Sequence, residues 1–328
     1  MNKMKLVFAA AALMLSTSMA HAVVITNGTV SLGVNATGEL NDSASGIGLT
    51  HNVTGFESTF DGCPCEGWGV GNGDSLIWGG ANQASHGPGG VNLSPVSFAS
   101  DGVNATSVVD IGGGGLQVKH EFTPSTSANL YSVKVTITNT SAIDINDVRY
   151  RRAMDWDIEP TQFSEYVTIQ GTTGATNINF ASNNGFANSD VFTSPGDIGF
   201  TGDFIDKGPA DHGAVFDFGF GTANGGSALK AGESLTFEIF YGAASTQGSL
   251  LSALASLGAE IYSLGKPNCD LGGTGTGCGF ASSVFAFGFK GVGGTVIPGA
   301  VPVPGAILLL LTGLAGLGGL GRMRSRSA

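Results

Sequence analysis

Residues 131–138 read YSVKVTIT, and this stretch decides the fold class. Its apolar residues, Tyr131, Val133, Val135 and Ile137, alternate with polar ones. Successive side chains of a β-strand point to opposite faces, so a period of two indicates a strand with one buried face and one solvent-exposed face.

The same alternation recurs along the chain between turn-forming residues. It is found in residues 116–122, 216–220, 235–241 and 285–289. Clusters of Gly, Asn and Ser separate these segments, as turns between strands require. We therefore predict an all-β fold, an antiparallel β-sandwich with glycine-rich loops, formed as one domain by residues 23–297.

One internal segment has the spacing of a helix. Between residues 247 and 264, Leu250, Leu254, Leu257 and Ile261 recur at intervals of four, three and four. This spacing predicts a single short helix, which Gly265 would end.

The composition excludes several classes of protein. Glycine makes up 54 of the 328 residues, but it has no three-residue period and there are only 11 prolines, so the chain is not collagen-like. Hydrophobic residues, at 42%, suffice for a sizeable core, which argues against disorder. The formal charge of −11 argues against a nucleic-acid-binding protein.

Residues 1–22 have the three parts of a secretory signal peptide. Lys3 and Lys5 form a basic start, and residues 6–15 (LVFAAAALML) form an apolar run that is too short for a membrane span of about 20 residues. The sequence Ala-His-Ala at residues 20–22 then places small residues at the −3 and −1 positions of a cleavage site. We predict export and cleavage by a signal peptidase directly after residue 22.

Residues 298–328 form a second distinct segment. A Val-Pro-Val-Pro motif at residues 301–304 precedes 17 uncharged residues (305–321, GAILLLLTGLAGLGGLG), which reach the lower limit for a transmembrane helix. The basic end, residues 322–328, contains Arg322, Arg324 and Arg326. Arginines at this position favour a cytoplasmic location for that end, so either a transient anchor or a plain tail anchor fits the pattern.

This tail resembles the PEP-CTERM sorting signal of Gram-negative bacteria. The resemblance rests on Val301, Pro302 and Pro304, on the Leu/Gly-rich apolar segment and on the terminal arginines. It departs from the commonest form at Val303, where that form has Glu, and is closer to the Val-Pro-Leu-Pro-Ala variant. The resemblance implies recognition by an exosortase-type enzyme, anchoring in the inner membrane before processing, and a link to exopolysaccharide and biofilm.

The body between the two predicted signals is strongly acidic. Removing Lys3, Lys5 and the three terminal arginines from the 14 basic residues leaves 9 against 25 acidic residues, a formal charge of −16. Such a surface repels anionic polymers unless cations bridge the two.

An even number of cysteines in a chain predicted to be exported favours disulfides, here two. The four cysteines are Cys63, Cys65, Cys269 and Cys278. We expect the local pairs Cys63–Cys65 and Cys269–Cys278, while pairing between the two groups stays open. A zinc site is a further alternative, although the spacings CxC and Cx8C differ from the usual zinc motifs.

The segment MDWDIEPT (residues 154–161) carries the candidate ligands for a metal ion. Asp155, Asp157 and Glu159 are two residues apart, so on a strand they would share one face. Three converging carboxylates suit calcium. Ion pairs with the nearby arginines at 149, 151 and 152 are an alternative, and a catalytic pair for sugar hydrolysis is another.

A second acidic stretch, GDFIDKGPADHG (residues 202–213), contains Asp211 beside His212. Neighbouring residues on a strand would point to opposite faces, so we expect a solvated polar loop there. No Gly-x-Ser-x-Gly, His-Glu-x-x-His or phosphate-loop motif occurs in the sequence.

Together these features predict a non-enzymatic protein that is exported to the cell envelope, the outer surface or the extracellular matrix. The alternatives are a calcium-dependent glycan-binding or adhesive module and a carbohydrate-active enzyme. No catalytic residue is assigned.

Overall fold

A computed structural model of the chain describes residues 22–271 and 283–298. Its strands form three antiparallel sheets with few helices, which confirms the predicted all-β class. Most of the predicted signal peptide lies outside the described residues, as do the sorting motif Val301, Pro302 and Pro304, the apolar segment that follows it, and the terminal arginines.

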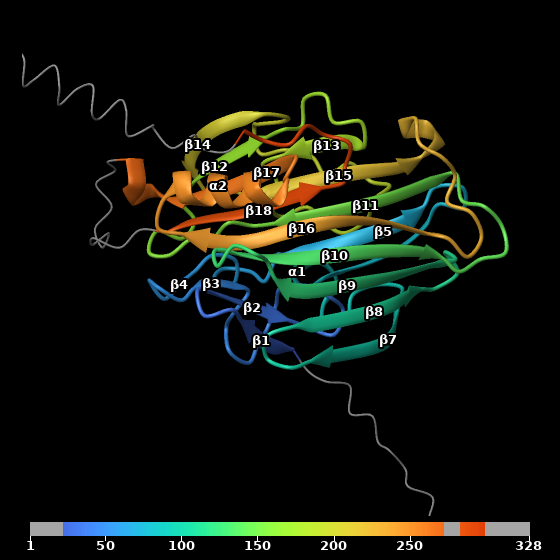
Figure 1. Ribbon diagram of the computed structural model, residues 1–328, viewed down its shortest axis with the longest axis horizontal. Helices are drawn as coiled ribbons and strands as arrows, with labels where there is room; N and C mark the ends of the chain where they lie inside the picture. Colours follow the sequence, from blue (N-terminus) through green and yellow to red (C-terminus); the bar gives the residue numbers. More distant parts are fainter. Residues whose placement is uncertain (1–21, 272–282, 299–328) are drawn as a thin grey trace, which may run out of the picture.

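The largest sheet has nine strands (Figure 1). The stretch that decides the fold class lies in its middle, in β10, where Val133 pairs with Phe122 of β9 and Ile239 of β16. The strand order across the sheet is β14 (Phe204–Ala210), β12 (Glu165–Gln170), β17 (Ile261–Pro267), β18 (Val284–Lys290), β16 (Ser234–Ala244), β10 (Leu130–Asn139), β9 (Leu116–Pro124), β8 (Ala105–Ile111) and β7 (Leu93–Ser100).

Two smaller sheets complete the structure. The five-stranded sheet has the order β13 (Ile178–Ser182), β15 (Ala214–Gly221), β11 (Asp147–Met154), β5 (Gly67–Asn72) and β6 (Ile77–Asn82). The four-stranded sheet consists of β1 (Val23–Thr26), β2 (Val30–Val34), β3 (Leu49–His51) and β4 (Phe56–Glu57).

One aromatic core joins the nine-stranded and five-stranded sheets. Phe216 of β15 lies 5.3 Å from Phe287 of β18 between ring centroids, and Phe218 lies 4.8 Å from Phe289. All four rings are buried. Because the alternating residues of each strand point the same way, each strand contributes a full row of side chains to this core.

The predicted helix is shorter than its sequence spacing suggested. Helix α2 spans Gln247–Leu257 and is capped at its start by Thr246, whose hydroxyl accepts from the Ser249 amide. Gly258 ends it in the left-handed conformation (φ 80°), and Ile261 already begins strand β17, so the predicted end near residue 264 is wrong. None of the helices among residues 22–271 and 283–298 is long and apolar enough to cross a membrane.

Helix α2 packs on the opposite face of the nine-stranded sheet from the aromatic core (Figure 1). Its buried residues Leu250 and Leu254 join a separate apolar cluster with residues of β16 and β18. The remaining helical segments are short: α1 (Gln83–His86), η1 (Thr222–Asn224) and η2 (Asn268–Leu271).

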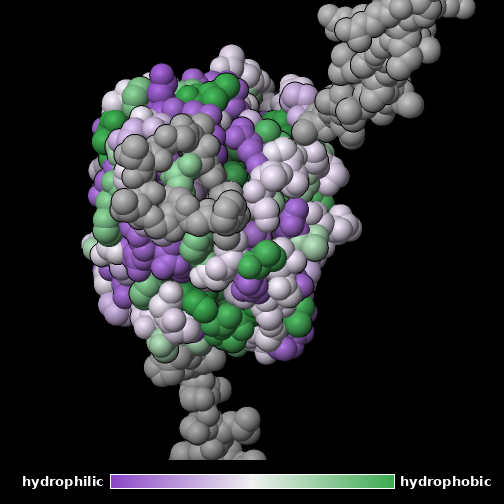
Figure 2. Space-filling view, turned by 90° about the vertical axis from the view of Figure 1, so that its left-hand side faces the viewer, coloured by the Kyte–Doolittle hydropathy of each residue, from purple (hydrophilic) through white to green (hydrophobic). Residues whose placement is uncertain are grey.

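On the face shown in Figure 2, hydrophobic residues form several separate groups among hydrophilic ones.

Strands β10 and β11 follow one another directly in the chain. They belong to different sheets, so the intervening segment carries the chain from the large sheet to the smaller one. Two other segments that pass between these sheets, residues 155–164 and 211–213, position the candidate site.

Candidate functional site

Two crossings between the sheets bring distant acidic residues together. Residues 155–164 lead from β11 in the five-stranded sheet to β12 in the nine-stranded sheet, and residues 211–213 lead from β14 back to β15. Because Met154 pairs with Ala214 across β11 and β15, the first crossing begins beside the point where the second one ends.

The two crossings and the start of β12 place four carboxyl side chains near one another, which we call the acidic cluster: Asp155, Asp157, Glu165 and Asp211. One carboxylate oxygen from each of Asp155, Asp157 and Asp211 lies within 4.8 Å of the other two. Asp155, Asp157 and Glu165 are at most 1% exposed, whereas Asp211 is exposed to solvent. The cluster is therefore a buried group of acids with one member at the surface.

Several oxygens of this cluster have no hydrogen-bond partner among the described residues. These atoms are Asp155 Oδ1, both carboxylate oxygens of Asp157, and Glu165 Oε2. None of the ion pairs formed within the described part of the chain includes a member of the cluster. Buried polar atoms are normally paired, so these oxygens call for a partner that residues 22–271 and 283–298 do not supply.

Burial and mutual repulsion both oppose ionisation of the cluster. Burial, followed by the charge of Asp211, raises the pKa of Asp155 to about 8. Burial, followed by the neighbouring carboxylates, raises the pKa of Asp157 to about 9, and mainly burial raises that of Glu165 to about 9. A bound cation would reverse this effect, because it favours the charged form of each carboxylate.

The arginines proposed as alternative partners are engaged elsewhere. Each pairs with a different acid: Arg149 with Asp147, Arg151 with Asp217, and Arg152 with Glu66. The ion-pair interpretation of the acidic segment is therefore wrong. Arg151 lies directly opposite Asp217 on the neighbouring strand, a spatial relation that spacing along one segment does not reveal.

The three acids predicted as metal ligands do not all converge. Asp155 and Asp157 belong to the cluster, but Glu159 accepts a hydrogen bond from the backbone amide of Glu57 (2.9 Å) and is not in the group of Asp155, Asp157 and Asp211. The segment 155–158 is not a strand, so the expected shared face of three alternating residues does not form. Asp211 and Glu165 take part instead.

Two glycines allow the crossings to approach this closely. A Cβ atom at Gly185 would lie 2.7 Å from Asp155 Oδ1, and one at Gly213 would collide with the Met154 carbonyl oxygen. Larger residues at either position would therefore displace Asp155.

The stretch 202–213 was expected to be a solvated polar loop; most of residues 204–210 are indeed exposed, but their backbone is not a loop. Residues 204–210 form the edge strand β14. His212 is buried, and its Nε2 lies 3.2 Å from the Glu165 carbonyl oxygen while its Nδ1 lies 2.9 Å from the amide of Asn183. Both ring nitrogens are thus occupied, and His212 holds the crossing in place beside Asp211.

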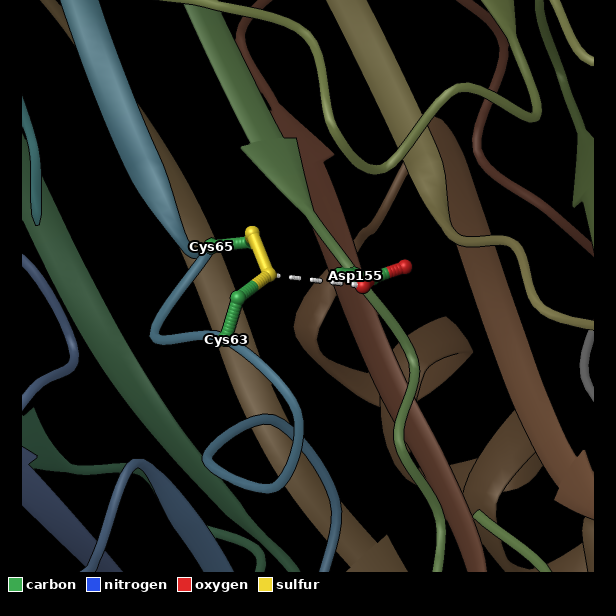
Figure 3. Close-up of side chains that lie close together, drawn as sticks. All are labelled: Cys63, Cys65 and Asp155. Atoms are coloured by element: carbon green, nitrogen blue, oxygen red, sulfur yellow. Dashed lines mark hydrogen bonds between the residues drawn. A yellow bond between two sulfur atoms is a disulfide. The ribbon is translucent and has the colours of Figure 1, made fainter. Parts of the chain in front are cut away.

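A disulfide borders the cluster. Cys63 and Cys65 are bonded to each other, and Cys63 Sγ lies 3.8 Å from Asp155 Oδ2, the contact drawn as a dashed line in Figure 3. Cys269 is also disulfide-bonded, and Cys278 lies outside the described residues.

Sequence reasoning missed a second buried charged group, in the core between the sheets. Arg152 and Glu66 form an ion pair with no solvent exposure of either side chain. The Tyr241 hydroxyl donates to Glu66 Oε1 (3.1 Å), the Leu40 amide donates to Glu66 Oε2 (2.6 Å), and Arg152 Nη2 donates to the Gly38 carbonyl (3.2 Å). This pair is fully enclosed, so its role is structural.

Comparisons with known proteins leave the family open. No family model matches the chain, and no curated protein matches it. Among solved structures, the chain is similar to a putative aldose 1-epimerase from Escherichia coli K12, at 9% identity and a TM-score of 0.33, with 84% of this chain and 92% of that chain covered. A likeness at this level carries no argument about the activity of this chain.

Proposed function

We propose that this protein is an exported cell-surface or matrix protein whose β-sheet body binds a calcium ion at the acidic cluster. The observation that supports the calcium site is the group of buried carboxylate oxygens that lack any partner among the described residues. Burying carboxyl groups without partners costs free energy, either as unpaired charge or as the uptake of a proton that their raised pKa values require at neutral pH. A cation between Asp155, Asp157 and Asp211 removes that cost.

The chemistry of these ligands favours calcium over other metals. Asp155, Asp157 and Asp211 each offer a carboxylate oxygen, the donor that hard cations prefer. Calcium accepts six to eight oxygen ligands in flexible geometry, whereas magnesium demands a near-ideal octahedron. Exposed Asp211 gives the ion a route from solvent to the buried members.

The two ends of the chain support export. The signal-peptide pattern of residues 1–22 would direct the chain through the export machinery, and the PEP-CTERM-like tail would hold it in the inner membrane until an exosortase-type enzyme processes it. The body, a two-layer β-sandwich in this proposal, would then associate with exopolysaccharide. Bound calcium lowers the negative charge of the body, which assists contact with an anionic polymer.

A calcium-dependent glycan-binding module is the second candidate, and a surface cleft favours it. The cleft has a volume of about 460 Å³ and lies beside the four-stranded sheet. Its lining includes Asn35, Thr37, Asn41 and Gln83, whose amide and hydroxyl groups bond to one another and to Glu39 and would exchange some of these bonds for the hydroxyls of a sugar. A glycan array probed with and without calcium distinguishes this candidate from a purely structural ion.

Calcium is expected to stabilise the purified protein against thermal unfolding. At free calcium of about 100 times the Kd, the gain in unfolding free energy is about 2.7 kcal/mol, and EDTA removes it. Asp157→Asn should abolish this gain, yet without calcium it should be at least as stable as the wild type, because Asp157, with its raised pKa, must take up a proton on folding at neutral pH and asparagine need not. The matched control is exposed Asp197→Asn, which keeps the full response; no Tm difference between calcium and EDTA in the wild type contradicts the site.

Deleting residues 302–328 is expected to release the body from the inner membrane into the periplasm or medium. The deletion removes the apolar segment and its basic end, the only parts of the tail able to anchor it. Cell fractionation followed by immunoblotting measures the location. An unchanged membrane-bound fraction would defeat the proposed sorting role.

A further inference from the structure

Asp155 belongs to two different groups of potential metal ligands. In one group its carboxylate lies with those of Asp157 and Asp211, and in the other it lies with the sulfur atoms of Cys63 and Cys65. Within each group the ligand atoms lie within 4.8 Å of one another. Figure 3 shows the second group, with the disulfide directed at the Asp155 carboxylate where the chain leaves β11.

The redox state of the cysteines decides which group can act. In the disulfide each sulfur is bonded to the other, so neither is available as a thiolate ligand. Asp155 is then left to the oxygen group, which suits a hard cation. Once the disulfide is reduced, two thiolates and a carboxylate converge from residues 63, 65 and 155.

We propose that reduction of the Cys63–Cys65 disulfide converts this region into a zinc site, with Cys63, Cys65 and Asp155 as ligands. The calcium half of this switch rests on the proposed function, whereas the zinc half stands on the cysteine group alone. Because Asp155 is common to both groups, zinc and calcium would exclude each other. The disulfide therefore selects between a hard and a thiophilic metal.

The chemistry of the conversion balances. A dithiol reductant supplies two electrons and two protons, the S–S bond breaks to give two thiols, and the dithiol becomes a disulfide. Zinc binding then displaces the two thiol protons to solvent. Three protein ligands leave the fourth tetrahedral position of zinc to a water molecule.

The structure gives the reductant access to the disulfide. Cys63 is partly exposed, while Cys65 is 4% exposed, so attack at the Cys63 sulfur meets the smaller obstruction. The two cysteines are separated by a single proline and stay close to Asp155, because the Asp157 amide donates to the Ser58 carbonyl (2.8 Å) and ties the two segments together.

Metal titration of the full-length protein tests the proposal. The protein is reduced with a phosphine, which is then removed under anaerobic conditions because added thiols would themselves bind zinc. Cobalt serves as the spectroscopic probe, and competition by zinc gives the affinity. The reduced wild type should show thiolate-to-cobalt charge-transfer absorption and bind zinc at least about a hundredfold more tightly than the oxidised protein.

Variants separate this site from other thiols and from the calcium site. Cys63→Ser/Cys65→Ser retains Cys269 and Cys278 and should lose the charge-transfer band, and Asp155→Asn should weaken zinc binding about tenfold or more. Asp157→Asn should keep zinc binding but lose calcium binding. Circular dichroism verifies that each variant is folded.

The outcomes are distinguishable. Equal zinc affinity of the oxidised and reduced wild type, or an unchanged cobalt spectrum in Cys63→Ser/Cys65→Ser, overturns the zinc site. Calcium binding by the oxidised protein together with either result leaves the proposed function intact. Zinc binding by the reduced protein without calcium binding by the oxidised protein overturns the proposed calcium site and leaves the zinc site intact.

Discussion

Replacing Arg152 by methionine is expected to lower the free energy of unfolding by about 3–5 kcal/mol, which denaturant unfolding measures. Arg152 and Glu66 are completely buried, and the ion pair lies in the core between the two larger sheets. Methionine fills much of the space but leaves the Glu66 carboxylate buried without its countercharge. The Tyr241 hydroxyl and Leu40 amide still donate to that carboxylate but cannot neutralise it.

Two further variants isolate the electrostatic contribution. Arg149→Met removes an arginine from the same strand, but its pair with Asp147 is partly exposed, so the expected loss is about 1 kcal/mol or less. The double variant Glu66→Gln/Arg152→Met should be more stable than Arg152→Met alone, because the unpaired charge has been removed. Equal losses for Arg152→Met and Arg149→Met would contradict the role of the buried pair.

Phe287→Ala is the second substitution for which a large loss is expected, about 3–5 kcal/mol of unfolding free energy. Phe287 lies on β18 and is completely buried, with ring-centroid distances of 5.3 Å to Phe216, 5.5 Å to Phe289 and 5.9 Å to Trp156. Alanine would remove these aromatic contacts and leave a cavity between the sheets, which rigid strands on both sides can close only in part.

The same substitution at an exposed ring provides the control. Phe186 is 42% exposed, and Phe186→Ala should cost less than about 1 kcal/mol. Equilibrium unfolding of both variants in urea makes the comparison. A loss for Phe287→Ala no larger than that for Phe186→Ala would mean that this cluster does not hold the sheets together.

The strands were predictable because their signal is local. Alternation in residues 131–138, 216–220, 235–241 and 285–289 predicts a strand in each, and the structure confirms each strand. In β18, however, the second face is buried as well, because helix α2 covers it. The end of helix α2 was not predictable from spacing alone. Ile261 continues the helical interval of the leucines before it, but Gly258 adopts a left-handed conformation and β17 gains its partners from β12 and β18.

The acidic cluster was predictable only in part, because its members come from different crossings. Asp155 and Asp157 are close in sequence, whereas Asp211 reaches them through the pairing of β11 with β15. No feature of residues 202–213 by themselves places Asp211 beside Asp155. Likewise, the partner of Arg152 is Glu66, on a segment 86 residues away, so local spacing pointed to the wrong acids.

Calcium titration calorimetry of the oxidised, metal-free protein tests the central claim most directly. The account predicts saturable binding of one calcium ion per chain in the wild type and in Asp197→Asn, and no measurable binding in Asp157→Asn. Absence of binding in the wild type, or unchanged binding in folded Asp157→Asn, would contradict the assignment of the acidic cluster as a calcium site.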